Sequence, residues 1–213
     1  MSSARDEILA RIRAALQKPD EHQPAEPDWQ APLYHEPEVQ DLVIRFAEVF
    51  QSRGGKFHFV DHPDNFFDVA AALVREQGWQ RIACYDGELE KYLQAAEIPY
   101  DADDTRLQEV EASFTFCEGL IARTGSVLVS SRLGGGRRLS VYPPVHVVVA
   151  FATQVVPDIA DGLAYLNQIY PDQLPSMLSM ITGPSRTADI EKTLVLGAHG
   201  PKEIHIILVD DAS

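Results

Sequence analysis

The feature that most constrains the fold is an alternation of helix-like and strand-like segments that begins at Glu38. Apolar residues recur at helical spacing in the longer segments, whereas the shorter ones are apolar runs bounded by Gly or polar residues. We expect helices at 39–51, 66–76 and 88–96 and strands at 56–60 and 81–84. Alternation at this spacing predicts βαβ units and a largely parallel sheet.

The second half of the chain is richer in strand-like segments. We expect strands at 112–116, 126–131, 139–142, 145–151, 176–181 and 203–209, and a helix at 158–169. The sequence therefore predicts a Rossmann-like three-layer α/β sandwich with a mostly parallel sheet, formed by residues 38–213.

Residues 1–37 differ from this pattern and are expected to form a helical arm and a linker. Ile8, Ile12 and Leu16 form an apolar stripe on a predicted helix at 3–17, and Ser3 is placed to cap it. Five of the chain's 14 prolines fall between residues 18 and 37, which favours an extended linker. Because this apolar stripe would otherwise be exposed to water, the helix is expected to dock either on the core or on another subunit. The second arrangement would give a homo-oligomer.

The composition excludes several classes of protein. The 213 residues carry a net charge of −14, which argues against binding to nucleic acid or to an anionic membrane. The longest apolar run has six residues, far short of the roughly 20 that span a bilayer. Arg5, Asp6 and Glu7 interrupt any secretory signal, so a cytoplasmic protein is expected. Two cysteines cannot form a four-cysteine cage, and we predict no metal site in this chain.

The negative charge is unevenly distributed. Residues 1–111 have a charge of −12, whereas residues 119–157 contain four arginines and no acid. Arg137 and Arg138 follow the run Gly134–Gly136. The arginines either bind an anionic ligand or pair with acids from the first half. The glycine run is either a hairpin loop or a place where backbone N–H groups approach an anion.

A second candidate site lies at 183–191, after an apolar strand. Gly183 and Pro184 predict a turn, and the residues that follow predict the start of a short helix. The polar residues of this turn either cap the helix or bind an anion beyond the carboxyl end of a strand. They are Ser185, Arg186, Thr187, Asp189 and Glu191. His199, in a Gly-rich connection, is free to face a cleft and is the histidine most favoured for function.

Several of these segments resemble one known family. They are IARTGS at 121–126, RLS at 138–140 with PPVH at 143–146, VVPD at 155–158, and ITGPSRTADIE at 181–191 continuing into GAHGP at 197–201. On these motifs the chain is identified as a member of the LUD-domain family, in the lactate-utilization protein C group. The resemblance covers residues 113–210 strongly and the first half only in pattern.

The resemblance implies a fold like that of sugar isomerases, CoA transferases and formyltetrahydrofolate cyclo-ligase. It also implies a subunit of an oxidoreductase complex that oxidises L-lactate to pyruvate together with two iron–sulfur partner proteins. No cofactor is expected in this chain, since the partners would carry the clusters. The family motifs in this sequence supply candidates for binding a small anionic or nucleotide-like ligand, and these include Thr124, Gly125 and Ser126. No catalytic residue is assigned.

One position departs from the family pattern, and two other functions stay open. Many relatives carry an acid where this chain has Arg123, and the change would make the pocket more positive. The first alternative is an independent enzyme of the CoA-transferase or cyclo-ligase type, although Glu118 lies in no recognisable nucleophile motif. The second is a non-catalytic assembly subunit whose acidic first half meets a basic partner.

Overall fold

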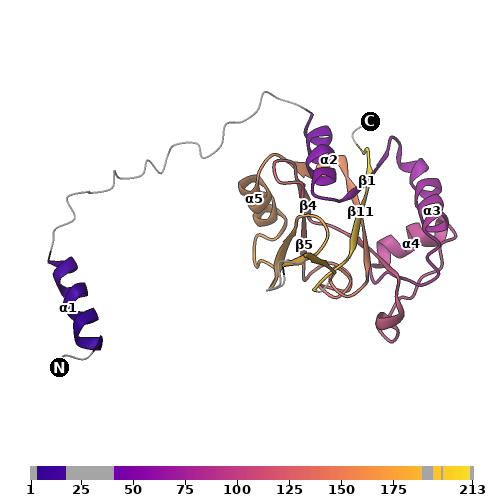
Figure 1. Ribbon diagram of the computed structural model, residues 1–213. Helices are drawn as coiled ribbons and strands as arrows, with labels where there is room; N and C mark the ends of the chain where they lie inside the picture. Colours follow the sequence, from indigo (N-terminus) through magenta and orange to yellow (C-terminus); the bar gives the residue numbers. More distant parts are fainter. Residues whose placement is uncertain (1–3, 18–40, 189–193, 198, 212–213) are drawn as a thin grey trace. The chain divides into compact units, whose positions relative to one another are not determined.

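A computed structural model describes residues 4–17, 41–188, 194–197 and 199–211 (Figure 1). The chain divides into two units, Met1–Pro37 and Glu38–Ser213. In the first unit, α1 (Ala4–Leu16) forms the expected helix, and Ile8, Ile12 and Leu16 are exposed. Ser3 and the proline-rich stretch lie outside the described residues. No helix of the described residues is long and apolar enough to cross a membrane.

The second unit is built on a five-stranded parallel sheet, ordered β1-β11-β6-β3-β2. Its strands are β1 (Lys56–Val60), β2 (Ile82–Ala83), β3 (Ala112–Phe116), β6 (Val145–Phe151) and β11 (Glu203–Val209). The three inner strands are almost continuously buried and mostly apolar, as expected for a parallel sheet covered on both faces. The last strand, β11, therefore lies inside the sheet, between β1 and β6.

Helices α3 (Phe66–Gln77) and α4 (Gly87–Ala95) cover one face of this sheet (Figure 1). Their apolar sides pack with Phe114, Val147 and Ile207 from the sheet. Helix α3 ends at Gly78, whose φ of 72° is the left-handed conformation that a glycine adopts without strain. A short 3-10 helix, Pro63–Asn65, leads into α3, and another, Leu107–Glu109, leads into β3.

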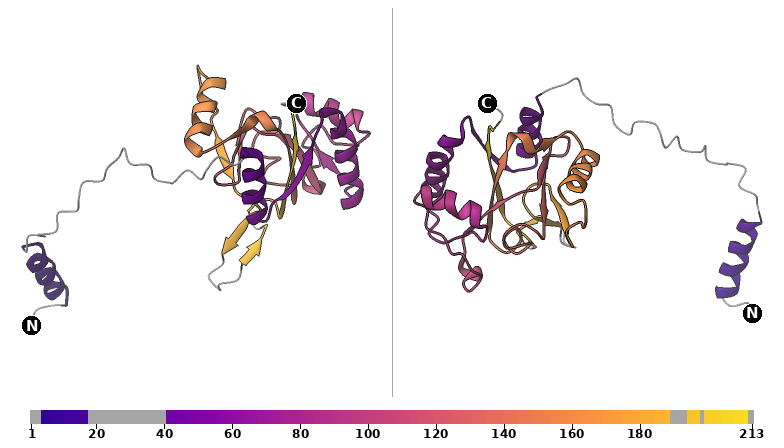
Figure 2. Two further views of the ribbon diagram at one scale, coloured as in Figure 1. Left: turned by 90° about the horizontal axis from the view of Figure 1, so that it is seen from above. Right: turned by 180° about the vertical axis from the view of Figure 1, so that it is seen from behind.

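The other face packs against a second, mainly antiparallel sheet and helix α2 (Leu42–Ser52). The second sheet is ordered β7-β4-β5-β8, and α5 (Ile159–Ile169) packs on its far face through Leu166. Its strands are β4 (Gly119–Ile121), β5 (Ser126–Ser130), β7 (Val155–Val156) and β8 (Leu178–Ile181), with a 3-10 helix at Ala152–Gln154. The predicted α/β class, with a mostly parallel central sheet and helices on both sides, is confirmed (Figures 1 and 2).

Two local predictions are wrong. Residues 139–142 form turns instead of a strand, because the carbonyl of Arg138 accepts hydrogen bonds from the N–H groups of Val141 and Tyr142. The glycine run before them is therefore not a hairpin loop. The helix expected after Gly183 is instead a strand: β9 (Arg186–Ala188) pairs antiparallel with β10 (Leu194–Leu196). This hairpin projects from the rest of the second unit (Figure 2, left).

Candidate functional site

Three hydroxyl groups join the turn before β5 to the end of β8. The buried Ser126 Oγ lies 2.7 Å from Thr124 Oγ1 and 2.7 Å from Thr182 Oγ1. Two of the predicted binding residues therefore meet, together with Thr182, which the sequence did not single out. The two threonine hydroxyls thus provide hydrogen-bond partners for Ser126, the one buried hydroxyl of the three.

Two predicted glycines allow close approach to the end of α2. Gly125 has a φ of 61°, and a Cβ placed there would lie 2.6 Å from the backbone nitrogen of Phe50. Gly183 has a φ of 81°, and its Cβ would lie 2.7 Å from the carbonyl oxygen of Arg53. No other side chain fits at either position, so the two glycines lock both turns against the helix terminus.

The polar groups of the 183–186 turn are used within the chain. Arg186 donates from Nη2 to the carbonyl of Arg53 over 2.7 Å, which satisfies a carbonyl at the end of α2. The Ser185 N–H donates to the Pro201 carbonyl at 2.9 Å, and the Ser185 carbonyl accepts from Gly197 at 3.1 Å. Pro184 lies against Gly54. This geometry explains the turn as an anchor for α2.

The structure describes only some of the other residues of the second candidate site. Thr187 lies within β9, whereas Asp189 and Glu191 fall outside the described residues. His199 is exposed, in the connection that leads to β11.

The glycine–arginine segment forms a separate cleft of about 950 Å³. We call it the arginine cleft; it is lined by Ser131, Leu133, Gly135, Gly136, Arg137, Arg138, Val141 and Tyr142. Arg138 forms an ion pair with Asp104, an acid of the first half, as one of the two open interpretations expected. Arg137 is exposed and has no ion-pair partner among the described residues. The guanidinium group of Arg137 can therefore bind an anion in the cleft.

The predicted residues gather at the amino edge of the central sheet, where its strands begin. The Lys202 N–H, just before β11, donates to Pro144, just before β6, over 2.8 Å. Ser113, in β3, donates from Oγ to the carbonyl of Leu139, inside the arginine-cleft loop, over 2.6 Å. The 183–186 turn follows the carboxyl end of a strand, as expected, but that strand is β8 of the antiparallel second sheet, so the turn does not lie at the carboxyl edge of the central sheet. Neither Arg186 nor His199 lines the arginine cleft.

Comparison with known proteins assigns the family. A model of the LUD domain matches residues 43–209, which is most of the chain. The chain belongs to the LUD-domain family. Lactate utilization protein C of Macrococcus caseolyticus is 33% identical over 106 residues, covering 49% of this chain and 46% of that protein. The protein of the same name from a Geobacillus strain is 36% identical over 106 residues, covering 49% and 44%.

The Bacillus subtilis protein of that name is 32% identical over 108 residues, covering 50% of this chain and 45% of its own length. The chain thus spans about half the length of the curated relatives that it matches. Among solved structures, a DUF162 family protein from Deinococcus radiodurans has a TM-score of 0.59 at 18% identity. The match covers 79% of this chain and 96% of that one, and it supports the fold.

Arg123 of this LUD domain is held by an acid. Its Nη2 lies 2.7 Å from Asp158 Oδ1, and the hydrogen bond lowers the pKa of the Asp158 carboxyl group. Asp158 also accepts from the Ile159 N–H as the N-terminal cap of α5. The positive charge of Arg123 is therefore balanced by its neighbour.

Glu118, named above only for its lack of a nucleophile motif, is a buried carboxylate between β3 and β4. The side chain of Glu118 is almost fully buried and accepts hydrogen bonds from Ser130 Oγ and, over 2.8 Å, from Tyr170 OH. Burial and the Glu118 carboxylate raise the pKa of Tyr170. This contact ties the end of α5 to β5. The family motifs give no signal for it, because Ser130 and Tyr170 are distant in sequence.

Two histidines lie fully buried in the central sheet of the LUD domain. His146 Nε2 lies 2.8 Å from Thr115 Oγ1, and burial lowers the pKa of His146 to about 4. His205 Nδ1 lies 3.2 Å from His58 Nε2, and burial, followed by Lys56 and His58, lowers the pKa of His205 to about 4. His199 was favoured over both of them for a functional role. The described residues contain no group of three His, Cys, Asp or Glu placed to hold a metal ion.

Proposed function

We propose that this chain is a component of an L-lactate utilization system, in which L-lactate is oxidised to pyruvate together with iron–sulfur partner proteins. The observation that carries the proposal is the LUD-domain match, joined by relatives that are named lactate utilization protein C. Since those relatives are about twice as long as the matched segment, the activity and the partners are part of the proposal.

The cysteines of the chain agree with electron carriers that lie in other proteins. Oxidation of L-lactate to pyruvate releases two electrons and two protons, and the partners' clusters would accept the electrons. Cys84 and Cys117 are both buried, and they belong to the cores on opposite faces of the central sheet. Burial raises the pKa of the Cys84 thiol to about 12, so it stays protonated and a poor ligand.

The arginine cleft is the best candidate for a small anionic or nucleotide-like ligand. Its walls contain Arg137, whose guanidinium suits a carboxylate or a phosphate, and two glycines that leave the backbone accessible. Arg138 contributes less positive charge because Asp104 pairs with it. A lactate carboxylate is a ligand of this class.

The function is tested by growth on L-lactate in a strain that lacks the gene and is complemented with variants. Arg137→Ala should slow lactate-dependent growth, whereas Arg132→Ala should leave it unchanged. Arg132 is the matched control, because it is also exposed but does not line the cleft. Equal growth of all strains, including the uncomplemented one, would remove the role in lactate utilization.

Partner binding is measured separately. The full chain, immobilised, should retain purified iron–sulfur lactate-utilization proteins, and Arg137→Ala should not change that retention. Loss of retention with Arg137→Ala would assign the cleft to assembly in place of ligand binding. No retention of either partner would contradict the proposed complex.

A further inference from the structure

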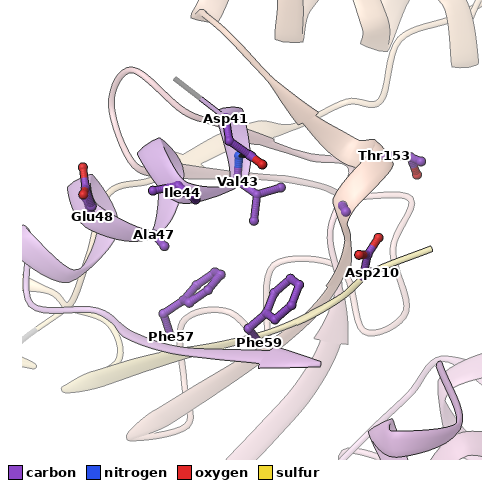
Figure 3. A pocket seen from close by; sticks show the side chains of 10 residues that line it. Asp41, Val43, Ile44, Ala47, Glu48, Phe57, Phe59, Thr153 and Asp210 are labelled. Atoms are coloured by element: carbon purple, nitrogen blue, oxygen red, sulfur yellow. Dashed lines mark hydrogen bonds between the residues drawn. The ribbon is translucent and has the colours of Figure 1, made fainter. Parts of the chain in front are cut away.

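The carboxyl edge of the central sheet carries a groove that the proposed function does not use. Helix α2 forms one wall and strand β1 the other, and the rings of Phe57 and Phe59 point from β1 toward the helix (Figure 3). The groove encloses about 710 Å³. Its lining residues, which define the acidic groove, are Asp41, Val43, Ile44, Ala47, Glu48, Phe57, Phe59, Ala152, Thr153 and Asp210.

The apolar part of the acidic groove is open to water. Phe59 is 51% exposed and Ile44 is 54% exposed, although both side chains are large and apolar. Covering such side chains removes apolar surface from water and so favours association. A small molecule held in a closed cavity would leave these residues covered by the protein itself, so the open shape favours a long apolar surface as occupant.

The charged residues that line the acidic groove are all acidic. Asp41, Glu48 and Asp210 contribute three carboxylates, and none of the ten lining residues is Lys, Arg or His. An anion is repelled here. A second copy docked about a two-fold axis would bring the same three carboxylates against themselves, which is also unfavourable.

We propose that the acidic groove binds an amphipathic helix of a partner protein, with an apolar face flanked by Lys and Arg. Apolar side chains spaced three and four residues apart would fill the space between α2 and the two phenyl rings. Basic side chains on either side of that face would meet Asp41, Glu48 and Asp210. This surface lies at the opposite edge of the sheet from the arginine cleft, so it can be tested independently of lactate.

The test uses fluorescence anisotropy with the full chain and a labelled 18-residue model helix of Leu and Lys. A matched peptide carries Glu at every Lys position. The Lys peptide should bind in the micromolar range, and the Glu peptide about tenfold more weakly or worse. Equal binding of the two peptides would overturn the charge argument.

Variants locate the binding surface. The double variant Ile44→Ser/Phe59→Ser should weaken the Lys peptide about tenfold, since both side chains are half exposed and are removed without opening the core. The control Leu163→Ser/Leu174→Ser removes two apolar side chains that lie outside the acidic groove and are 48% and 44% exposed. This control should bind the Lys peptide as tightly as the unaltered chain does. Circular dichroism confirms the folding of each variant. Equal binding by both double variants would overturn the proposed site.

Two further occupants are outcomes of the same test. A peptide of residues 4–17 is added as a competitor of the labelled Lys peptide. If it displaces that probe at a lower concentration than unlabelled Lys peptide does, the groove is assigned to this chain's own helix. Sedimentation equilibrium is run in parallel. A dimer that dissociates in Ile44→Ser/Phe59→Ser would assign the groove to a second copy. Either result would overturn the proposal of a basic partner helix.

Discussion

The two edges of the central sheet present opposite chemistry. At the amino edge, the loop before β6 holds Arg137 and Arg138 in a cleft with glycine walls. At the carboxyl edge, the residues after β6 and β11 help to form an apolar groove rimmed by three carboxylates. Strand β6, with seven residues, separates them by about 20 Å. A single net charge of −14 therefore averages over two surfaces that suit different partners.

Helix α2 runs from one edge to the other. Its first turns supply Val43 and Ile44 to the acidic groove, and its last residues contact the two turns locked by glycine. The carbonyl of Arg53, just beyond its end, accepts a hydrogen bond from Arg186. The first turns of α2, at the groove, are half exposed. The last turn of α2, at the amino edge of the sheet, is fixed by contacts with the backbone of both turns. The comparison predicts that substitutions at the amino edge cost more stability.

The largest effect is expected at Gly125. Gly125→Val should lower the free energy of unfolding by about 3 kcal/mol or more, because it adds left-handed backbone strain to a collision with Phe50. The control is Gly78→Ala, where φ is also positive but no atom lies within 4 Å of the new Cβ. It should cost only the strain, about 1–2 kcal/mol. Urea denaturation measures both, and equal losses would contradict a packed α2 terminus.

The next effect is a loss of stability in acid that begins at the amino edge. His146 and His205 lie near the starts of β6 and β11 and have pKa values of about 4, below the ordinary 6.5. The unfolded chain therefore binds more protons between pH 6.5 and 4. Stability is complete above pH 6.5 and falls as the pH drops toward 4, by roughly 1.4 kcal/mol per pH unit for each histidine.

His146→Gln isolates one of these contributions. The variant should show a pH slope smaller by roughly 1.4 kcal/mol per unit between pH 6 and 5, whatever its stability at pH 7. Hydrogen exchange at pH 5 should increase first in the amino halves of β6 and β11. An unchanged slope would mean that His146 is already protonated in the folded protein.

A smaller effect is expected for the hydroxyl that anchors the arginine cleft. Ser113→Ala leaves the buried carbonyl of Leu139 without its donor and should cost about 1–2 kcal/mol of unfolding free energy. It should also weaken the proposed binding of L-lactate to the cleft a few-fold, measured by calorimetry. Ser52→Ala removes an exposed hydroxyl that bonds to Val49 and should change stability by less than about 0.5 kcal/mol. Similar losses for the two serines would show that the Ser113 bond does not hold the loop.

The smallest effect concerns Arg123. Arg123→Met should cost about 1 kcal/mol or less, because the pair with Asp158 is partly exposed, and the pKa of Asp158 should rise toward its usual value. Lys91→Met, which breaks a fully exposed pair with Glu88, should cost only about 0.3 kcal/mol. Titration of Asp158 by NMR checks the Arg123→Met prediction. An equal pKa of Asp158 in the variant and in the unaltered protein would contradict the ion pair.

The sequence predicted the fold best where burial dictates the residue type. Four strands match their expected bounds: 56–60, 112–116, 145–151 and 203–209. The last three are inner strands of a parallel sheet, and burial on both faces keeps most of their residues apolar. The prediction failed at 139–142, where Leu-Ser-Val-Tyr has the alternation of a strand but closes a turn on Arg138. It failed again after Gly183, where capping residues instead enter a hairpin.

The functional surfaces were less predictable than the strands. Local composition was enough to find the arginine cleft, because one loop supplies all of its walls. The acidic groove combines α2, β1 and the residues after β6 and β11, which lie up to 169 positions apart from Asp41 to Asp210. No local pattern marks such a surface. Its acids were visible only as part of the overall charge.

The place of β11 in the sheet sets the order in which the protein can form. This strand pairs with β1 on one side and β6 on the other, although it is synthesised after both. Until residues 203–209 emerge from the ribosome, β1 has no neighbour and β6 has one open edge. The nascent chain therefore presents unpaired strand edges at β1 and β6 until β11 has been made. Such long-range pairing slows folding, and the sheet cannot close until β11 is available, so the open strand edges depend on protection beforehand.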